Sequence, residues 1–304
     1  MHVIKLLSPF AFATSSLILT AGEASVPASY PVSPQWVPSL GMGYLHQLDA
    51  DVDSGGSFSV DRANFDFGMT RVYGPGKMAG VSIGYGYHDY HFENMAVNPW
   101  NEVHSLSLAF PVRWELDDRW SLFALPSARA NFENGADISD SVTGGMLAGA
   151  TYKFSDRLSI GPGIGMSSEL EDTFNVFPIL LIRWKISDDL VLQTSGSQGA
   201  SQGPGLALTW QAAEKWKFSL GARYERLRFR LDDDGANPDG VGEEKGLPVY
   251  LGVSYQISKD SELSFYTGVK FAASLEVDNS TGDSVYKSDH DAAPFVGLSW
   301  NAKF

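Results

Sequence analysis

The sequence predicts an all-β protein, a single antiparallel transmembrane β-barrel of about 14 strands. Three observations carry this prediction. Apolar and polar residues alternate along many segments of strand length, as they do in strands with two different environments. Short polar turns alternate with longer, often acidic loops. The last twelve residues, 293–304, place Val296, Leu298, Trp300, Ala302 and Phe304 on one apolar face and small or polar residues on the other.

Composition limits the classes of protein that the chain can represent. Its 304 residues suit one barrel of middling size, or one or two soluble domains. Hydrophobic residues make up 43% of the chain, yet no stretch after the amino terminus is apolar over the roughly 20 residues that a helical span needs. The absence of cysteine excludes a disulfide scaffold and thiolate metal sites, and the net charge of -14 argues against nucleic acid as a partner.

The amino terminus has the features of a secretory signal peptide, assigned to residues 1–24. Lys5 supplies a positive start, residues 6–19 are mostly apolar, and Gly22 with Ala24 offers a cleavage site, with a less ideal one at 26–28. A single-helix membrane anchor is the alternative, but the segment is short and Pro9 interrupts it. Residues 25–36 contain three prolines and no periodicity, so we assign them to a periplasmic lead-in before a barrel of residues 37–304.

One unit repeats along the barrel region: two alternating strands joined by a tight polar turn, followed by a longer loop. The proposed strands span about 37–48, 58–73, 78–91, 102–116, 119–132, 142–154, 157–169, 174–186, 189–197, 203–212, 215–231, 246–257, 261–276 and 293–304. The tight turns lie near 74–77, 117–118, 155–157, 187–189, 212–215 and 258–260, and the long loops near 49–56, 92–101, 133–141, 170–173, 197–203, 232–246 and 277–291. The strands at 189–197 and 203–212 are the shortest, and fusing or losing them would leave a barrel of about 12 strands.

Tryptophans mark the level of the tight turns. Those predicted to face outward near these turns or near the carboxy terminus are Trp114, Trp120, Trp184, Trp210, Trp216 and Trp300, joined at the same level by Tyr73, Phe154, Tyr255 and Phe304. Aromatic rings gather in this way, as a girdle, at the headgroup level of a membrane. A soluble barrel or sandwich with an apolar interior is the alternative, but it would scatter its tryptophans through a core.

The last strand resembles the closing strand of bacterial outer-membrane β-barrels, whose terminal aromatic residue is part of the assembly signal. The resemblance covers residue 37 to the end and rests on Phe304 with Ala302, Trp300 and Leu298, on the girdle, and on the alternation of short turns with long loops. It implies the outer membrane of a Gram-negative bacterium, short turns on the periplasmic side and long acidic loops outside. It also implies contact with outer-membrane lipid and lipopolysaccharide, and recognition by the barrel-assembly machinery. The chain looks like a porin-like or transport-type barrel, although it carries no substrate-defining motif.

Inward positions are mostly glycine, serine, threonine, asparagine and charged residues. The charged candidates for a lumen or selectivity role are Arg113, Arg129, Arg183, Arg223, Lys270, Asp66 and Glu225. Rings of basic residues make a pore prefer anions, whereas ion pairs between strands would hold the wall together. Pairing is the favoured interpretation because the carboxylates lie at similar heights. The small inward residues predict a narrow aqueous passage.

Three functions are compatible with this architecture. The leading one is a porin-like channel for the passive passage of small solutes, which an open lumen would favour. The second is a structural or surface-interaction barrel with an occluded lumen, whose acidic loops at 49–53 and 232–244 contact divalent cations and lipopolysaccharide phosphates. The third is an outer-membrane enzyme acting on lipid, which needs a His–Ser or Asp–His pair near the outer rim.

The histidines supply no complete catalytic pair. His104 is followed by Ser105 and Ser107, which alternate to the opposite face, and Asp89 with His91 lacks a second carboxylate pair. The glycine-rich run at 161–165 lies inside a strand with no helix after it, so it does not form a phosphate loop. The acidic loops do not have the spacing of an EF-hand. We therefore predict no catalytic residue, metal site or cofactor.

Overall fold

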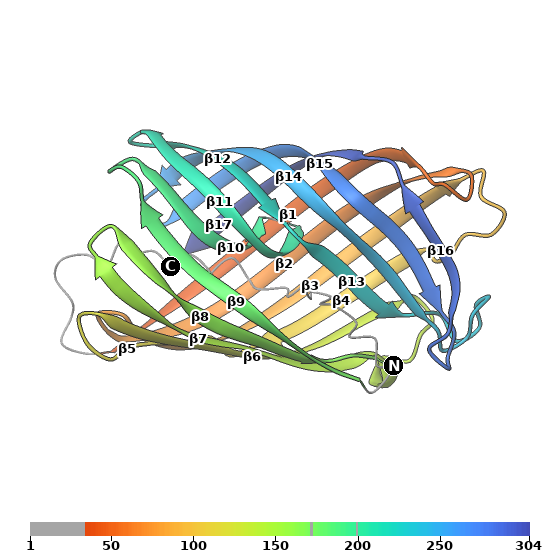
Figure 1. The fold of residues 1–304 in the computed structure, drawn as a ribbon, viewed down its shortest axis with the longest axis horizontal. Coiled ribbons are helices and arrows are strands. Elements are labelled where there is room, and N and C mark those ends of the chain that lie inside the picture. The colour runs from red at the N-terminus through yellow and green to blue at the C-terminus, as the bar shows by residue number, and fades with distance from the viewer. Residues whose placement is uncertain (1–33, 171–172, 199) are drawn as a thin grey trace, which may run out of the picture.

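A computed structural model of the chain describes residues 34–170, 173–198 and 200–304. These residues form a single closed antiparallel β-barrel of 14 strands (Figure 1). Three barrel strands are each interrupted once, so the 14 strands comprise 17 segments. The predicted fold is confirmed. The proposed signal peptide and most of the lead-in lie outside the described residues.

The segments have the following bounds. They are β1 (Gln35–Asp51), β2 (Ser57–Gly74), β3 (Lys77–Glu93), β4 (Glu102–Ala109), β5 (Val112–Glu115), β6 (Trp120–Glu133), β7 (Val142–Ser155), β8 (Leu158–Ser168), β9 (Phe174–Lys185), β10 (Leu190–Gln198), β11 (Ser201–Ala213), β12 (Trp216–Arg223), β13 (Glu225–Arg230), β14 (Val241–Ser258), β15 (Ser261–Asp278), β16 (Ser284–His290) and β17 (Ala293–Lys303). Segments β4 with β5, β12 with β13, and β16 with β17 form one barrel strand each. A short 3-10 turn, η1 (Ser139–Ser141), precedes β7.

The carboxy-terminal strand closes the barrel. β17 pairs with β15 on one side and with β1 on the other, where the ladder runs from Ser39 opposite Lys303 to Gln47 opposite Phe295. The backbone amide of Phe304 donates a hydrogen bond of 2.9 Å to the carbonyl of Pro38. A closed ladder leaves no open edge at this seam, which is what a barrel in lipid requires. Within the described residues, no helix is long and apolar enough to cross a membrane.

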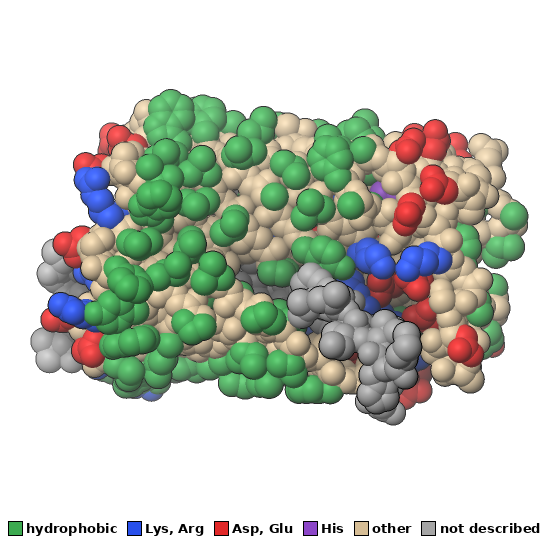
Figure 2. Space-filling model, in the orientation of Figure 1, with side chains coloured by type: hydrophobic (Ala, Val, Ile, Leu, Met, Phe, Trp, Pro, Cys, Tyr) green, Lys and Arg blue, Asp and Glu red, His purple; other side chains and the backbone are tan. Residues whose placement is uncertain are grey.

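The outer surface carries a broad apolar band. Figure 2 shows hydrophobic side chains spread along the barrel wall, with acidic side chains gathered toward its two ends. The predicted girdle tryptophans Trp114, Trp120, Trp184, Trp210 and Trp216 are all exposed on this surface, and so is Phe304. Large apolar side chains that face solvent in a monomer mark a surface meant for another environment. Here they form a continuous band, which is the surface of a barrel in a membrane.

The segments β10 and β11 both form, so the barrel has fourteen strands and not twelve.

The wall is taller on one side than on the other. Two predicted loops were too long: residues 241–246 belong to β14, and residues 284–290 form β16. β14 and β15 have 18 residues each, whereas β9 has 12. At about 3.3 Å per residue and a tilt near 40°, β9 rises by roughly 30 Å and the taller strands by roughly 45 Å.

The outer half of the barrel is filled by a dry core. Buried side chains from the outer parts of β1 to β4, from β13 and from β15 pack together, and Trp100 from the loop before β4 lies among them. β13 stays paired with β14 along its whole length and also reaches the outer end of β6, where Arg230 pairs in parallel with Phe132. Phe229 of β13 packs edge-on against Trp100 with ring centroids 5.1 Å apart. The outer end of the described barrel is therefore closed by packed side chains.

Candidate functional site

Two large cavities occupy the half of the lumen near the tight turns and the carboxy terminus, the end predicted to be periplasmic. The larger measures about 550 Å³ and is lined from β5 to β9, and the other measures about 380 Å³ and is lined from the opposite wall. Arg113 and Arg183, two of the predicted lumen residues, both line the larger cavity together with Lys153. Turn residues such as Asp117 and Asp156 line it too, so it lies at the periplasmic mouth. Charged groups at this mouth meet water.

The charges at the mouth are partly paired. Lys153 Nζ lies 2.7 Å from Asp156 Oδ1, and Arg113 Nη2 lies 3.6 Å from Glu115 Oε1. These side chains are well exposed, so their attraction is screened and contributes little to stability. Their guanidinium and ammonium groups stay available to a solute that enters the cavity.

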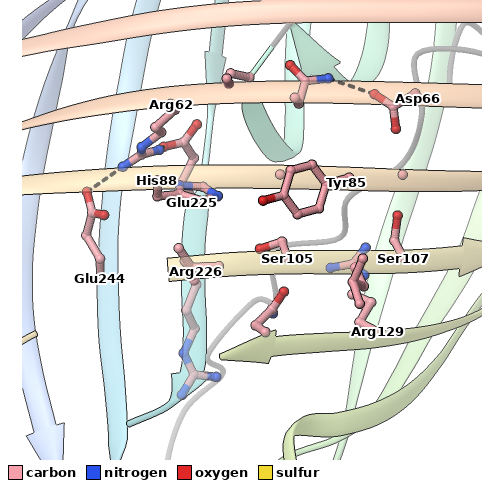
Figure 3. Close-up of a pocket in the computed structure, with 18 of the residues that line it drawn as sticks. Arg62, Asp66, Tyr85, His88, Ser105, Ser107, Arg129, Glu225, Arg226 and Glu244 are labelled. Atoms are coloured by element: carbon pink, nitrogen blue, oxygen red, sulfur yellow. Dashed lines mark hydrogen bonds and ion pairs between the residues drawn. The ribbon is translucent and has the colours of Figure 1, made fainter. Parts of the chain in front are cut away.

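A much smaller cavity lies deeper, below the dry core. It measures about 70 Å³ and is lined by four of the predicted lumen residues: Asp66, Arg129, Glu225 and Lys270. Figure 3 shows that side chains from β2, β3, β4, β6, β13 and β14 converge on it. A cavity of this size holds a few water molecules and excludes a typical solute. The lumen therefore narrows sharply between the periplasmic mouth and the outer half.

A buried ion network closes the top of this small cavity. Arg62 Nη2 lies 2.6 Å from Glu244 Oε1, and Arg62 Nη1 lies 3.2 Å from Glu225 Oε2. Lys270 Nζ lies 2.5 Å from Glu244 Oε1, and the Tyr90 hydroxyl donates a hydrogen bond to Glu244 Oε2. The four charged side chains are at most 9% exposed. Two cations and two carboxylates balance, which is how buried charges are tolerated.

The remaining predicted lumen residue, Arg223, is also buried. Its guanidinium lies over the ring of Tyr250, 4.8 Å from the ring centroid. Arg223 is 2% exposed, so it does not line either of the wide cavities. A cation held against an aromatic face is stabilised by the ring quadrupole. Of the seven predicted residues, two line the larger mouth cavity and four line the small cavity, and Arg223 stacks on Tyr250. Asp66, one of the four, also lines the cavity of about 380 Å³.

Comparison with known proteins places the chain in a family. The family described as "Domain of unknown function (DUF6268)" matches residues 63–304, which is most of the barrel. The chain belongs to this family. No curated protein matches the chain.

Two solved structures share the fold of this DUF6268 member. An outer membrane channel from Pseudomonas putida F1 is similar with a TM-score of 0.51 and 8% identity, over 91% of this chain and 97% of that protein. A FadL homologue from Pseudomonas aeruginosa is similar with a TM-score of 0.50 and 12% identity, over 89% of this chain and 90% of that protein. At such low identity the likeness concerns the fold, which is that of outer-membrane barrels.

The sequence missed several members of the buried network in this DUF6268 barrel. Glu243 and Glu244 were assigned to a solvated acidic loop, but they lie in β14 and are 5% and 2% exposed. The loop assignment was wrong because β13 supplies arginines opposite them: Arg228 is the ladder partner of Glu243. Arg62 could have been found, since it shares the inward face of β2 with Asp66.

Aromatic side chains cover several of the inward glycines that were predicted to line an aqueous passage. Tyr266 lies across Gly297 and Phe177 lies across Gly165, so closely that a Cβ at either glycine would overlap the ring. Small residues in these strands therefore make room for rings from neighbouring strands, which cover the exposed glycine backbone. The inner wall of β6, β7 and β9 is apolar as well, formed by Phe123, Leu125, Leu147, Phe177 and Ile179. The prediction of a mostly polar inner face does not hold for this patch, although Ser121, Thr151 and Arg183 of the same strands line the larger cavity.

One Asp–His pair lies near the outer rim: His46 Nδ1 is 2.9 Å from Asp61 Oδ1, which also accepts a hydrogen bond from the exposed Tyr44 hydroxyl. In the described part of the chain, no serine is hydrogen-bonded to this pair. His104 faces outward and its Nδ1 lies 2.9 Å from the hydroxyl of outward-facing Tyr85, whereas Ser105 and Ser107 line the small inner cavity. His91 approaches Asp89 only to 3.7 Å. Among the described residues, no group of three or more potential ligands is arranged to hold a metal ion. The described barrel therefore combines charged cavities at one end with a packed core at the other.

Proposed function

We propose that this barrel is a porin-like channel of the bacterial outer membrane for the passive passage of small solutes, with its outer end closed in the conformation described. The observation that carries the proposal is the pair of charged cavities, about 550 and 380 Å³, at the periplasmic end. Porin lumens are polar and hydrated, unlike the packed interiors of small barrels. The fold shared with two outer-membrane barrels supports the proposal as analogy.

The closed outer end must open before a solute can pass through the barrel. A solute from the mouth meets the buried network of Arg62, Glu225, Glu244 and Lys270, and then the dry core around Trp100. Separating buried ion pairs costs several kcal/mol, so the open state is a minor population at rest. Weakening the network should raise that population.

Single-channel conductance in a planar bilayer under a salt gradient tests this function. We expect rare openings for the unmodified protein and more frequent openings for Glu244→Gln. Arg113→Glu combined with Arg183→Glu should shift the reversal potential toward cations, because both guanidinium groups line the larger cavity. Arg157→Glu is the matched control, since Arg157 pairs with Asp188 on an exposed turn outside that cavity. A folded but silent protein, silent also as Glu244→Gln, would refute the channel.

A structural or surface-interaction barrel is the second candidate. The dry outer core favours it, since the outer half resembles the filled interior of a small barrel. In that case the outer loops would contact lipopolysaccharide through divalent cations, and the barrel-assembly machinery would recognise the strand that ends at Phe304. Silence in the conductance experiment, with binding of lipopolysaccharide that a chelator abolishes, would support this function. We propose no enzymatic activity for the barrel.

A further inference from the structure

One strand of the barrel is paired very unevenly. β9 forms eleven ladder pairs with β8, from Leu158 opposite Trp184 to Ser168 opposite Phe174. On its other side it forms only three pairs with β10, between residues 183–185 and 191–193. Above them, the described residues of β10 pair with β11 alone, with a register shift between Ser195 and Ser197. Residues 174–182 of β9 therefore have an open edge on the side of β10.

The sequence accommodates this open edge. The hydroxyl of Thr194 accepts a hydrogen bond of 2.9 Å from the Ile182 amide and donates one of 3.0 Å to the Leu180 carbonyl. These contacts identify the even-numbered residues as those whose backbone groups point toward β10, because backbone groups alternate along a strand. Pro178 is one of them, and it has no amide hydrogen to leave unpaired. Proline in a strand is confined to positions of this kind.

An open edge in the bilayer needs a physical explanation. β9 has 12 residues and rises by roughly 30 Å, about the thickness of the hydrocarbon layer. Its outward side chains Phe174, Val176 and Leu180 are exposed apolar groups, so this level of the wall meets lipid. Unpaired backbone is tolerated there only where it borders a cavity or is covered. Leu181 and Ile182, at the periplasmic end of this edge, line the larger cavity, so the edge borders the lumen there.

The interior behind this edge is apolar. Phe177 and Ile179 of β9 point inward and pack with Leu125, Leu147 and Phe123 of the neighbouring strands. A polar solute gains nothing from such a wall, whereas an apolar one exchanges lipid for side chains of similar polarity at little cost. The chemistry of the wall selects an uncharged, apolar solute.

The outer end of the open edge is closed by ion pairs and not by a ladder. Glu169, at the end of the hairpin of β8 and β9, accepts from Arg226 Nη1 and from Arg228 Nη1, each at 2.8 Å. Both arginines belong to β13, where it crosses toward β6. The three side chains are at most 11% exposed. Ion pairs that bridge two strands can separate without unzipping a sheet, so they form a latch.

We propose that the open edge of β9 is a lateral opening through which an apolar, uncharged solute passes between the lumen and the outer membrane, and that Glu169 latches it. The inference rests on the proposed function and names the solute class and the exit. It explains how a barrel with a dry outer core can conduct: the solute leaves through the wall below that core. The doorway lies between β9 and the strands β10 and β13.

Fluorescence quenching tests the lateral opening. The chain has no cysteine, so Ile179→Cys can be labelled specifically, and Leu45→Cys on the fully paired β1 serves as the matched control. Both positions face the interior. In lipid vesicles containing a bromoalkane, we expect several-fold stronger quenching at residue 179 than at residue 45. We also expect the quenching at residue 179 to increase when Glu169→Gln is added. The neutral amide cannot hold the guanidinium groups of both Arg226 and Arg228, so the latch opens more often.

The outcomes separate this inference from the proposed function. Glu262→Gln removes a carboxylate from a half-exposed pair with Lys217 at the opposite wall and should leave the quenching unchanged. Equal quenching at residues 179 and 45, or no response to Glu169→Gln in protein that shows the heat-dependent gel shift of a folded barrel, would overturn the lateral opening even if the protein conducts ions. Latch-dependent quenching in a protein that conducts no ions would support the opening and refute the ion channel.

Discussion

Glu244→Gln is the substitution that tests the outer closure most directly. Glutamine keeps the shape of the side chain and removes its charge. In the folded protein, Glu244 is 2% exposed and is shared by Arg62 at 2.6 Å and Lys270 at 2.5 Å. After the substitution only Glu225 faces these two cations, at 3.2 Å from Arg62 and 3.7 Å from Lys270. The network then carries one uncompensated positive charge.

The expected loss of stability follows from that charge. Breaking a buried pair by removing one partner costs about 3–5 kcal/mol, because the other charge remains buried without compensation. The Tyr90 hydroxyl also loses a charged acceptor, and hydrogen bonds to charged groups contribute about 1.5–3 kcal/mol. These effects are not additive, so we expect a decrease of about 3–5 kcal/mol in the free energy that keeps the outer half closed.

Two measurements and two matched variants check this expectation. Guanidinium unfolding in detergent, followed by tryptophan fluorescence, reports the free energy of unfolding, and hydrogen exchange reports opening of β14 and β15 at their outer ends. Glu276→Gln should change the free energy of unfolding by less than about 1 kcal/mol, because its partners Lys287 and Lys245 are 54% and 28% exposed. Adding Lys270→Met to Glu244→Gln should recover part of the lost stability. It removes the uncompensated positive charge and leaves one cation, Arg62, paired with one carboxylate, Glu225. If Glu244→Gln lowers the free energy of unfolding by less than about 1 kcal/mol and leaves hydrogen exchange in β14 unchanged, the buried network does not hold the outer half closed.

Three further predictions concern the strand ends and the turns. Deleting Phe304 should lower the yield of heat-resistant, folded barrel in the outer membrane, and an unchanged yield would show that Phe304 is not the assembly signal. Gly297→Val should destabilise the barrel by about 1–3 kcal/mol because its side chain overlaps the ring of Tyr266, and adding Tyr266→Ala should relieve this overlap in thermal unfolding. A hydrogen bond from the backbone amide of Arg119, with a second from the next residue, lowers the pKa of Asp117 below 3.8. The stability it supplies is present above pH 3.8 and lost as pH falls through the lowered pKa, so unfolding midpoints of the unmodified protein and Asp117→Asn should converge in acid.

Alternation along the chain determined the architecture before any coordinates. A strand in a barrel meets lipid on one face and the lumen on the other, so apolar positions recur at every second residue and register is strongly specified. For this reason β17 could be placed from residues 293–304 alone. The same alternation predicted that Trp114, Trp184 and Trp216 face outward, and all three are exposed. The lengths of the outer strands were less predictable, because β14 and β16 extend beyond the bilayer, where alternation no longer separates lipid from lumen.

The sequence by itself therefore determined the fold class, the closing strand, the apolar band and most of the inward charges. Only the tertiary structure decided what those charges do. Glu244 and Arg62 are 182 residues apart in sequence, and they meet because the barrel curls β2 and β14 around the same small cavity. The crossing of β13 to β6 and the three-pair contact between β9 and β10 likewise depend on pairings between distant segments. Period-two alternation specifies which face a side chain occupies, and it carries no information about which distant strand that face will meet.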